Sequence, residues 1–210
     1  MRHMHRLAAF VFSLVLSAGA SAAVVSSTNT TYGVFDGSEG TRALRVDTRG
    51  TVRDVNITVE FSKCDDPPIG PNGTRCLGTG DPFEEEFVLT LIAPDDTAVD
   101  LVQPYSTYDG RGRGAGRVSV TFDDEALRAA GPRIEAGSFR PEQALSAFDG
   151  MNTFGLWTLY LQDFFPADPL EFFSARLDIT YDPAPVPEPA TLAMLGLGLG
   201  LMGMRAARKR

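Results

Sequence analysis

The middle of the chain is predicted to be all-β, an antiparallel β-sandwich of about seven or eight strands. Two observations predict this fold: apolar and polar residues alternate in several short runs, and clusters of Gly, Pro, Asp and Asn separate these runs. A third observation concerns the two ends, where an apolar stretch lies beside basic residues. The 210-residue chain therefore has room for one domain of ordinary size flanked by processing segments.

Residues 1–22 have the three-part order of a secretory signal peptide. Arg2 and Arg6 precede ten uncharged residues, 7–16, and small residues follow up to Ala22. This order predicts export and cleavage between Ala22 and Ala23. A membrane anchor is the alternative, but ten strongly apolar residues fall well below the ~20 that span a bilayer.

Residues 23–41 are expected to be a lead-in, and residues 42–182 the sandwich. The clearest strand is 55–61, where Val55, Ile57, Val59 and Phe61 alternate with polar residues. The other predicted strands are 42–47, 87–93, 98–102, 117–122, 156–162 and 175–181. Residues 123–130 suggest a helical turn, with Asp123 as a possible N-cap. Trp157 lies inside a strand pattern, which predicts a role in the core.

The C-terminal segments read as a spacer, a membrane helix and a tail. Residues 183–189 form a Pro-rich spacer that ends in Pro187, Glu188 and Pro189, and residues 190–207 carry Arg205 as their one charge. As a helix, those eighteen residues would span about 27 Å, enough for a bilayer core. The basic tail 208–210 would stay cytoplasmic, which leaves the domain outside the cell.

This order of Pro-Glu-Pro, apolar helix and basic tail resembles the PEP-CTERM sorting signal of Gram-negative bacteria that secrete exopolysaccharide. The resemblance implies that exosortase, a membrane cysteine protease, is the processing partner. It would cut near Pro187, Glu188 and Pro189 and release the domain or transfer it to the cell surface. A permanent single-span anchor is the alternative.

The middle resembles the P domain, or P/Homo B domain, that follows the catalytic domain of kexin-like and furin-like subtilases. The resemblance lies in 50–52, 86–97, 100–101, 121–126, 137–141, 145–150 and the closing Gly-Leu-Trp-Thr-Leu of 155–159 with Asp163. It implies a jelly-roll sandwich of about eight strands. The chain departs from the family at Glu86-Phe87, where an Asp-Leu with a His a few residues before it is usual, and at Asp96, where a Gly is usual. Residues 164–172 also lack the family's Gly-rich hairpin.

Charge and histidine content exclude several classes of function. Of the 19 basic residues, 13 fall within 23–189, together with all 27 acidic ones, so this part carries a net charge of −14. Such a surface repels nucleic acid and anionic lipid. His3 and His5 are the two histidines, and both lie in the predicted signal peptide. The middle therefore has no imidazole for Ser/His or Cys/His catalysis or for a histidine-ligated zinc.

Cys64 and Cys76 are the two cysteines, and in an exported protein such a pair most simply forms a disulfide. Closing a loop of this size contributes about 3 kcal/mol in the chain-entropy model. Free thiols or a metal site are the alternatives, although no histidine is present to complete a zinc site.

Two acidic clusters are candidate calcium ligands, because calcium relieves the repulsion between neighbouring carboxylates. One cluster is Asp65, Asp66, Asp81, Glu84, Glu85 and Glu86, and the other is Asp123, Asp124 and Glu125. A solvated acidic surface is the alternative. The family resemblance directs the search for calcium to Asp123, Asp124 and Asp163. No other cofactor is expected.

We expect a non-enzymatic module at the cell surface or in the exopolysaccharide matrix. No spacing of residues picks out the pair of facing carboxylates that a glycosidase needs. A polysaccharide-binding module is the first alternative, with the loop aromatics Tyr105, Tyr108 and Phe164 as contacts, or Arg111 and Arg113 for an acidic polymer. An accessory partner of a separately encoded subtilase is the second.

Overall fold

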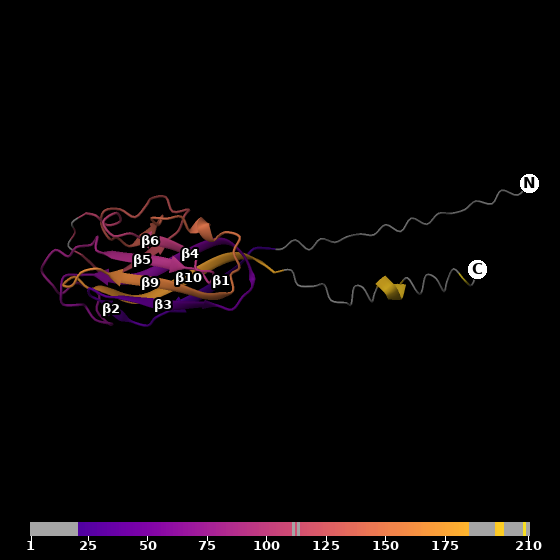
Figure 1. The fold of residues 1–210 in the computed structure, drawn as a ribbon, viewed down its shortest axis with the longest axis horizontal. Coiled ribbons are helices and arrows are strands. Elements are labelled where there is room, and N and C mark those ends of the chain that lie inside the picture. Colours follow the sequence, from indigo (N-terminus) through magenta and orange to yellow (C-terminus); the bar gives the residue numbers. More distant parts are fainter. Residues whose placement is uncertain (1–20, 111, 113, 185–195, 200–207, 209–210) are drawn as a thin grey trace, which may run out of the picture.

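The computed structural model describes residues 21–110, 112, 114–184, 196–199 and 208 (Figure 1). Within them, ten strands form two sheets, and one short 3-10 helix, η1 (Leu145–Phe148), lies between β8 and β9. The first sheet has the order β1-β10-β4-β7-β8, with β2 paired to β10, and the second has the order β3-β9-β5-β6. The prediction of an all-β, two-sheet domain is confirmed.

The strands are β1 (Ala23–Asn29), β2 (Gly33–Phe35), β3 (Glu39–Val46), β4 (Gly50–Lys63), β5 (Phe87–Ile92), β6 (Ala98–Val102), β7 (Ala115–Phe122), β8 (Gly137–Phe139), β9 (Gly155–Asp163) and β10 (Leu170–Pro183). All seven runs predicted from alternation coincide with strands, although 42–47 and 87–93 each extend one residue beyond the end of the strand. The structure adds β1, β2 and β8. Neighbouring strands are antiparallel except β7 and β8, which are parallel.

Two expectations differ from the structure. Residues 23–41, expected as a lead-in, contain β1 and β2, because their backbone pairs with β10 along seven and three register positions. Residues 123–130 form no helix: the N–H of Ala126 bonds the carbonyl of Asp123 at 3.1 Å, and the chain then runs on without a helical turn. Leu127 is fully exposed, so this segment has no apolar face to bury as a helix.

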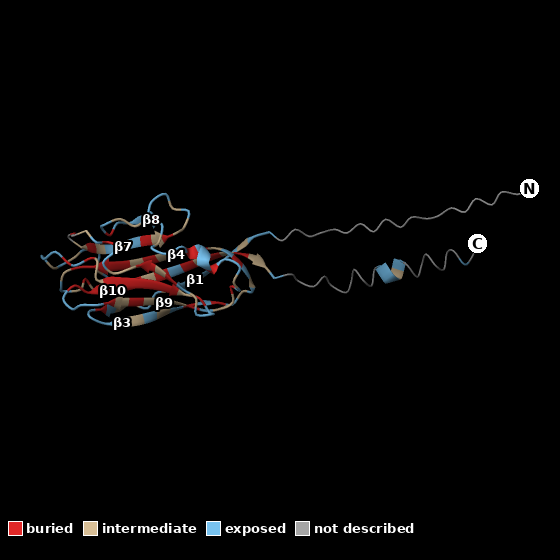
Figure 2. Cartoon of the chain, turned by 45° about the horizontal axis from the view of Figure 1, so that its top comes forward, coloured by how far each residue is buried: buried red, intermediate tan, exposed pale blue. Residues whose placement is uncertain are grey.

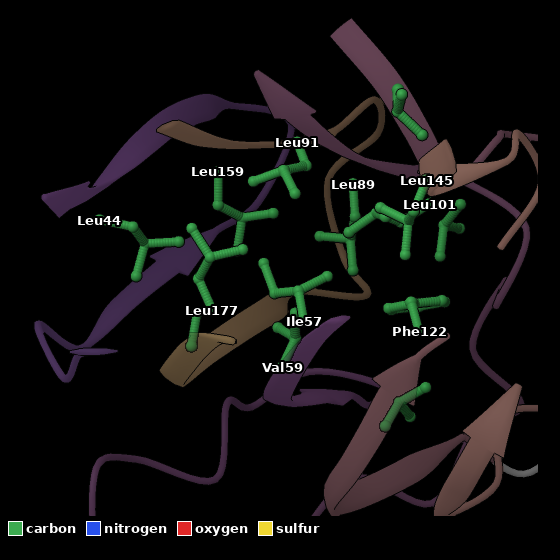
Figure 3. Close-up of a cluster of buried hydrophobic side chains, with 14 of the residues drawn as sticks. Leu44, Ile57, Val59, Leu89, Leu91, Leu101, Phe122, Leu145, Leu159 and Leu177 are labelled. Atoms are coloured by element: carbon green, nitrogen blue, oxygen red, sulfur yellow. The ribbon is translucent and has the colours of Figure 1, made fainter. Parts of the chain in front are cut away.

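The core lies between the sheets and is built on β4 and β10, the two longest strands (Figure 2). Period-two alternation on β4 turns its apolar side chains inward, as predicted. Ile57 and Val59 meet Leu177 of β10 and leucines from the facing sheet, among them Leu89, Leu91 and Leu159 (Figure 3).

Trp157 of β9 belongs to this core, as predicted. Its side chain is fully buried, and the indole N–H donates to the carbonyl of Thr153 at 3.0 Å. The ring of Phe148 meets it edge-on, with 5.1 Å between centroids. Both the apolar body and the polar tip of the indole are therefore satisfied.

The sandwich has two distinct ends. At the end we call the terminal end, Ala23 pairs with Tyr181 and Gly50 with Pro183, so β1 begins and β10 ends there (Figure 1). At the other end, which we call the disulfide end, Lys63 pairs with Leu170. The 14 residues of β10 place about 45 Å between the two ends, at ~3.3 Å per residue.

Most of the predicted processing segments lie outside the described residues. Of the signal peptide 1–22, residues 21 and 22 are described. Of the predicted membrane helix 190–207, residues 196–199 are described, and they are helical. No helix within the described parts of the chain is long and apolar enough to cross a membrane.

Candidate functional site at the disulfide end

The disulfide end is built from long loops, and the predicted disulfide holds the longest of them. Cys64 directly follows β4 and is bonded to Cys76, with 5.4 Å between their Cα atoms. The bond lies within a segment, 64–86, that contains no strand and separates β4 from β5. The chain therefore projects an irregular loop from this end and pins it covalently at its base.

A buried carboxylate fixes the tip of the same loop. Glu171 of β10 is fully buried and accepts hydrogen bonds from the backbone N–H groups of Ile69 and Gly70, both at 2.8 Å. Its remaining partners are the hydroxyls of Ser62 at 2.8 Å and Tyr32 at 2.6 Å. Burial, reinforced by this carboxylate, raises the pKa of Tyr32 well above its usual range. Glu171 is thus an anchor for the loop.

Asp163, one of the predicted calcium ligands, forms a buried ion pair at this end. Its Oδ2 lies 2.8 Å from the Nζ of Lys63, and neither side chain is exposed to solvent. The same oxygen accepts the N–H of Leu170 at 3.0 Å, and Lys63 also donates to the carbonyl oxygen of Asp168. Burial raises the pKa of Asp163, and the positive charge of Lys63 opposes that rise. The carboxylate is therefore already paired within the chain.

The other two predicted calcium ligands lie elsewhere. Asp124 accepts the N–H groups of Leu145 and Ser146 at 2.9 and 2.8 Å, which fixes the start of η1. Asp123 follows Phe122, which pairs with Ile57, and Ile57 is six residues from Lys63 along β4. That separation amounts to about 20 Å. Asp123, Asp124 and Asp163 therefore do not form one site.

The acidic residues of the disulfide loop also bond the chain itself. Glu84 is buried and accepts the N–H groups of Gly114 and Ile134 at 3.0 and 3.1 Å. Asp65 accepts the N–H of Gly80 at 2.9 Å. Burial raises the pKa of both Glu84 and Glu86. Among the described residues, no group of three or more His, Cys, Asp or Glu side chains is arranged to hold a metal ion.

Of the three aromatic residues predicted as polysaccharide contacts, two are on the surface. Tyr105 is 61% exposed and Phe164 is 40% exposed. Tyr108 is wrong as a surface contact, because its ring is buried and stacks on Phe87 with 5.9 Å between centroids. Burial raises its pKa well above the usual range.

Two further exposed aromatics, Phe83 and Phe165, escaped the sequence analysis. The backbone brings all four together: Tyr105 and Phe164 donate their N–H groups to the carbonyls of Glu85 and Glu86, at 2.9 and 3.0 Å. Phe83 belongs to the same segment and donates its N–H to Asp168 at 3.0 Å. We call Phe83, Tyr105, Phe164 and Phe165 the aromatic rim. The Phe-Phe pair directly after β9 is the sequence feature from which two members of the aromatic rim, Phe164 and Phe165, could have been predicted.

Comparison with known proteins identifies the C-terminal signal. The model of the PEP-CTERM protein-sorting motif matches residues 185–210, directly after the sandwich. This confirms the predicted PEP-CTERM motif, which indicates an exported protein sorted by exosortase to the cell surface or the exterior. No curated protein matches the chain.

The solved structures similar to the chain include two of a serine protease. The serine protease of Aeromonas sobria in complex with a chaperone shares 13% identity at a TM-score of 0.46, over 78% of this chain and 28% of that one. The structure of the serine protease of Aeromonas sobria shares 14% identity at a TM-score of 0.43, over 77% of this chain and 27% of that one. The chain thus spans little more than a quarter of either.

Proposed function

We propose that the protein is a non-enzymatic module that its sorting signal delivers to the cell surface or to the extracellular matrix. The observation that carries this proposal is the PEP-CTERM match over residues 185–210, which begins two residues after β10 ends at Pro183. Residues 1–22 are removed during export, between Ala22 and Ala23. Residues 190–207 hold the domain in the membrane until exosortase cuts near Pro187, Glu188 and Pro189.

A non-enzymatic role is supported by the state of the buried carboxylates. Asp163 is paired with Lys63, and Glu171 and Glu84 accept hydrogen bonds from backbone N–H groups of the chain's own loops. A general acid or base must instead reach a substrate proton. These acids therefore serve the fold, and the mature sequence contains no histidine to replace them.

We interpret the fold as a jelly roll of the P-domain type. Without the three-residue strands β2 and β8, the sheet orders β1-β10-β4-β7 and β3-β9-β5-β6 are those of a double-sheet roll with eight strands. Along the chain these strands alternate between the two sheets, except that β5 and β6 are consecutive strands of one sheet, which is the chain order of a jelly roll. The central position of Trp157 fits the resemblance of residues 155–159 to the family.

Polysaccharide binding at the disulfide end is a second candidate function, and the aromatic rim favours it. Four exposed aromatic side chains lie on loops that buried carboxylates and a disulfide hold in place. Aromatic faces stack on the C–H faces of sugar rings, and a rigid loop loses little entropy on binding. The rim also lies at the end remote from the membrane anchor. Affinity gels with neutral glycans would test it, since Tyr105→Ala should lose retention that Phe154→Ala, near the terminal end, keeps.

The sorting proposal is tested by the intact mass and location of the protein made in its native host. We expect the wild-type protein outside the inner membrane, with a mass that lacks residues 1–22 and the residues after the Pro-Glu-Pro motif. Glu188→Ala should remain in the membrane fraction at the larger mass, whereas the matched surface variant Glu142→Ala should be processed normally. A wild-type protein that keeps residues 190–210 would contradict exosortase cleavage and favour a permanent anchor.

A further inference from the structure

A depression of about 180 Å³ lies beside β8, on the flank of the sandwich near the disulfide end. Arg128, Arg133 and Glu135 supply its charged groups, and Pro132 and Phe139 supply apolar surface. Two backbone hydrogen bonds fix its position: the N–H of Gly110 donates to Pro132 at 2.8 Å, and that of Tyr108 donates to Gly131 at 3.3 Å. The depression is therefore held against the segment that follows Tyr105 of the aromatic rim.

Its charge is opposite to that of the rest of the domain. Residues 126–140 contain three arginines, Arg128, Arg133 and Arg140, and one acid, Glu135, which gives a net charge of +2. Residues 23–189 as a whole carry −14. The domain surface repels anions in general, so an anion is attracted here because the cations are concentrated locally.

The two arginines of the depression have N–H donors available for a ligand. The guanidinium carbon of Arg128 lies 4.6 Å from the ring centroid of Phe139, which holds its plane over the apolar floor. Its one ion pair, with Glu135, is long at 3.4 Å, and both side chains are more than half exposed. Arg133 makes no hydrogen bond or ion pair with the described residues, although its charge acts on Glu84. Both guanidinium groups thus retain donors for a ligand.

We propose that this depression binds the carboxylate of an acidic sugar residue within a polysaccharide. A guanidinium presents two parallel N–H donors that match the planar carboxylate. Arg128 already pairs with Glu135, whereas Arg133 pairs with no acid of the depression. The pyranose ring next to the carboxylate rests its C–H face on Pro132, which is exposed. This proposal extends the second candidate function, polysaccharide binding, by naming an acidic sugar as the ligand. It rests on the proposed export of the domain.

The position of the depression suits an oligosaccharide better than a single sugar. Gly110 lies five positions after Tyr105, which limits the distance between their Cα atoms to about 17 Å. Gly110 is bonded to Pro132 in the wall of the depression. One glycan of several units can therefore place an acidic unit on the arginines and a neighbouring unit against the aromatic rim.

The test is calorimetric titration of the full-length protein with tetragalacturonate, in a polyoxyethylene detergent that carries no sugar headgroup. We expect the acid to bind more tightly than the methyl ester of the same tetramer, with an affinity that weakens with added salt. Arg133→Gln should weaken it about tenfold, since a hydrogen bond between charged groups is lost. The matched control Arg45→Gln removes an equal charge from β3, where Arg45 pairs with Asp47, and should leave the affinity unchanged.

Glu135→Gln provides a second variant with an effect of opposite sign. It frees Arg128 from its competing partner and should tighten binding about twofold to fivefold. The proposal is overturned if the methyl ester binds as well as the acid, if inorganic phosphate or a Glu-rich peptide displaces the tetramer at equal ionic strength, or if Arg133→Gln and Arg45→Gln behave alike. Thermal unfolding of each variant shows whether it is folded. Failure of the sorting proposal would instead appear as an uncleaved protein in the host and would not alter this titration.

Discussion

The buried ion pair between Lys63 and Asp163 gives the sharpest test of how the disulfide end is held together. Lys63→Met keeps most of the volume of the side chain but leaves the Asp163 carboxylate buried without its cation. Breaking a buried pair in this way costs about 3–5 kcal/mol. Asp163 keeps the N–H of Leu170 at 3.0 Å and that of Phe165 at 3.4 Å, which partly stabilise the charge. We therefore expect a loss near the lower limit, about 3 kcal/mol.

The double variant Lys63→Met/Asp163→Leu separates a charge effect from a packing effect. It removes both charges and leaves the N–H of Leu170 without an acceptor, which costs about 1–3 kcal/mol, offset by new apolar burial. We expect its stability to lie within about 2 kcal/mol of wild type, above that of the single variant. An exposed pair gives the control: Arg45→Met, beside Asp47, should change stability by less than about 0.5 kcal/mol.

The stability deficit of Lys63→Met should change with pH in a direction that follows from the pKa of Asp163. Burial raises the pKa of Asp163 and Lys63 opposes the rise, so removing Lys63 raises this pKa further. A carboxyl with a higher pKa in the folded than in the unfolded state destabilises the fold fully above the folded pKa, and this loss shrinks as the pH falls through the folded pKa and disappears below the unfolded pKa. The deficit of Lys63→Met should therefore shrink as the pH is lowered from neutral toward acid.

Urea unfolding followed by the fluorescence of Trp157, the single tryptophan, measures all these variants. A deficit below about 1 kcal/mol for Lys63→Met, or one that stays constant with pH, would refute the reasoning.

Three further predictions concern the same fold. Glu171→Ala removes the acceptor of four hydrogen bonds; we expect a loss of about 4 kcal/mol by urea unfolding, and amide exchange should rise most at residues 66–75, where the loop tip is released. Cys64→Ser with Cys76→Ser should lower stability by about 3 kcal/mol, and a reductant should then change the urea midpoint of the wild type but not of the variant. Trp157→Ala should cost about 3–5 kcal/mol by thermal unfolding; a loss below about 1 kcal/mol would contradict its place in the core.

The sequence predicts best those strands that bury one face. β4 shows this clearly, because its apolar residues Val55, Ile57, Val59 and Phe61 alternate with polar ones. Such alternation is expected where one face of a sheet is buried, so both the strand and the direction of its side chains can be predicted from it. β1 carries Ser26, Ser27 and an exposed Val24, and it is a strand because its backbone pairs with β10. An edge strand of that kind leaves almost no hydrophobic pattern.

The site is less predictable because its partners are far apart in the sequence. Lys63 and Asp163 are one hundred residues apart, and no local pattern distinguishes a carboxylate that will meet a lysine from one that will meet calcium or water. Tyr108 lies among loop residues, yet packing against Phe87 buries it. Spacing within a loop carries no information on such contacts, which only the closed sandwich creates.

The position of β10 determines how the domain responds to force. β10 is the last strand before the sorting signal, and it is paired with β4 along its length and, on its other side, with β1 over residues 175–181 and with β2 over residues 170–172. When the C-terminus is tethered and a ligand pulls on the opposite end, the load runs parallel to this strand. Its inter-strand bonds are then sheared together instead of opening one after another, so the rate of forced unfolding is set by a single large barrier. A domain loaded in this way would resist force along the axis between its two ends.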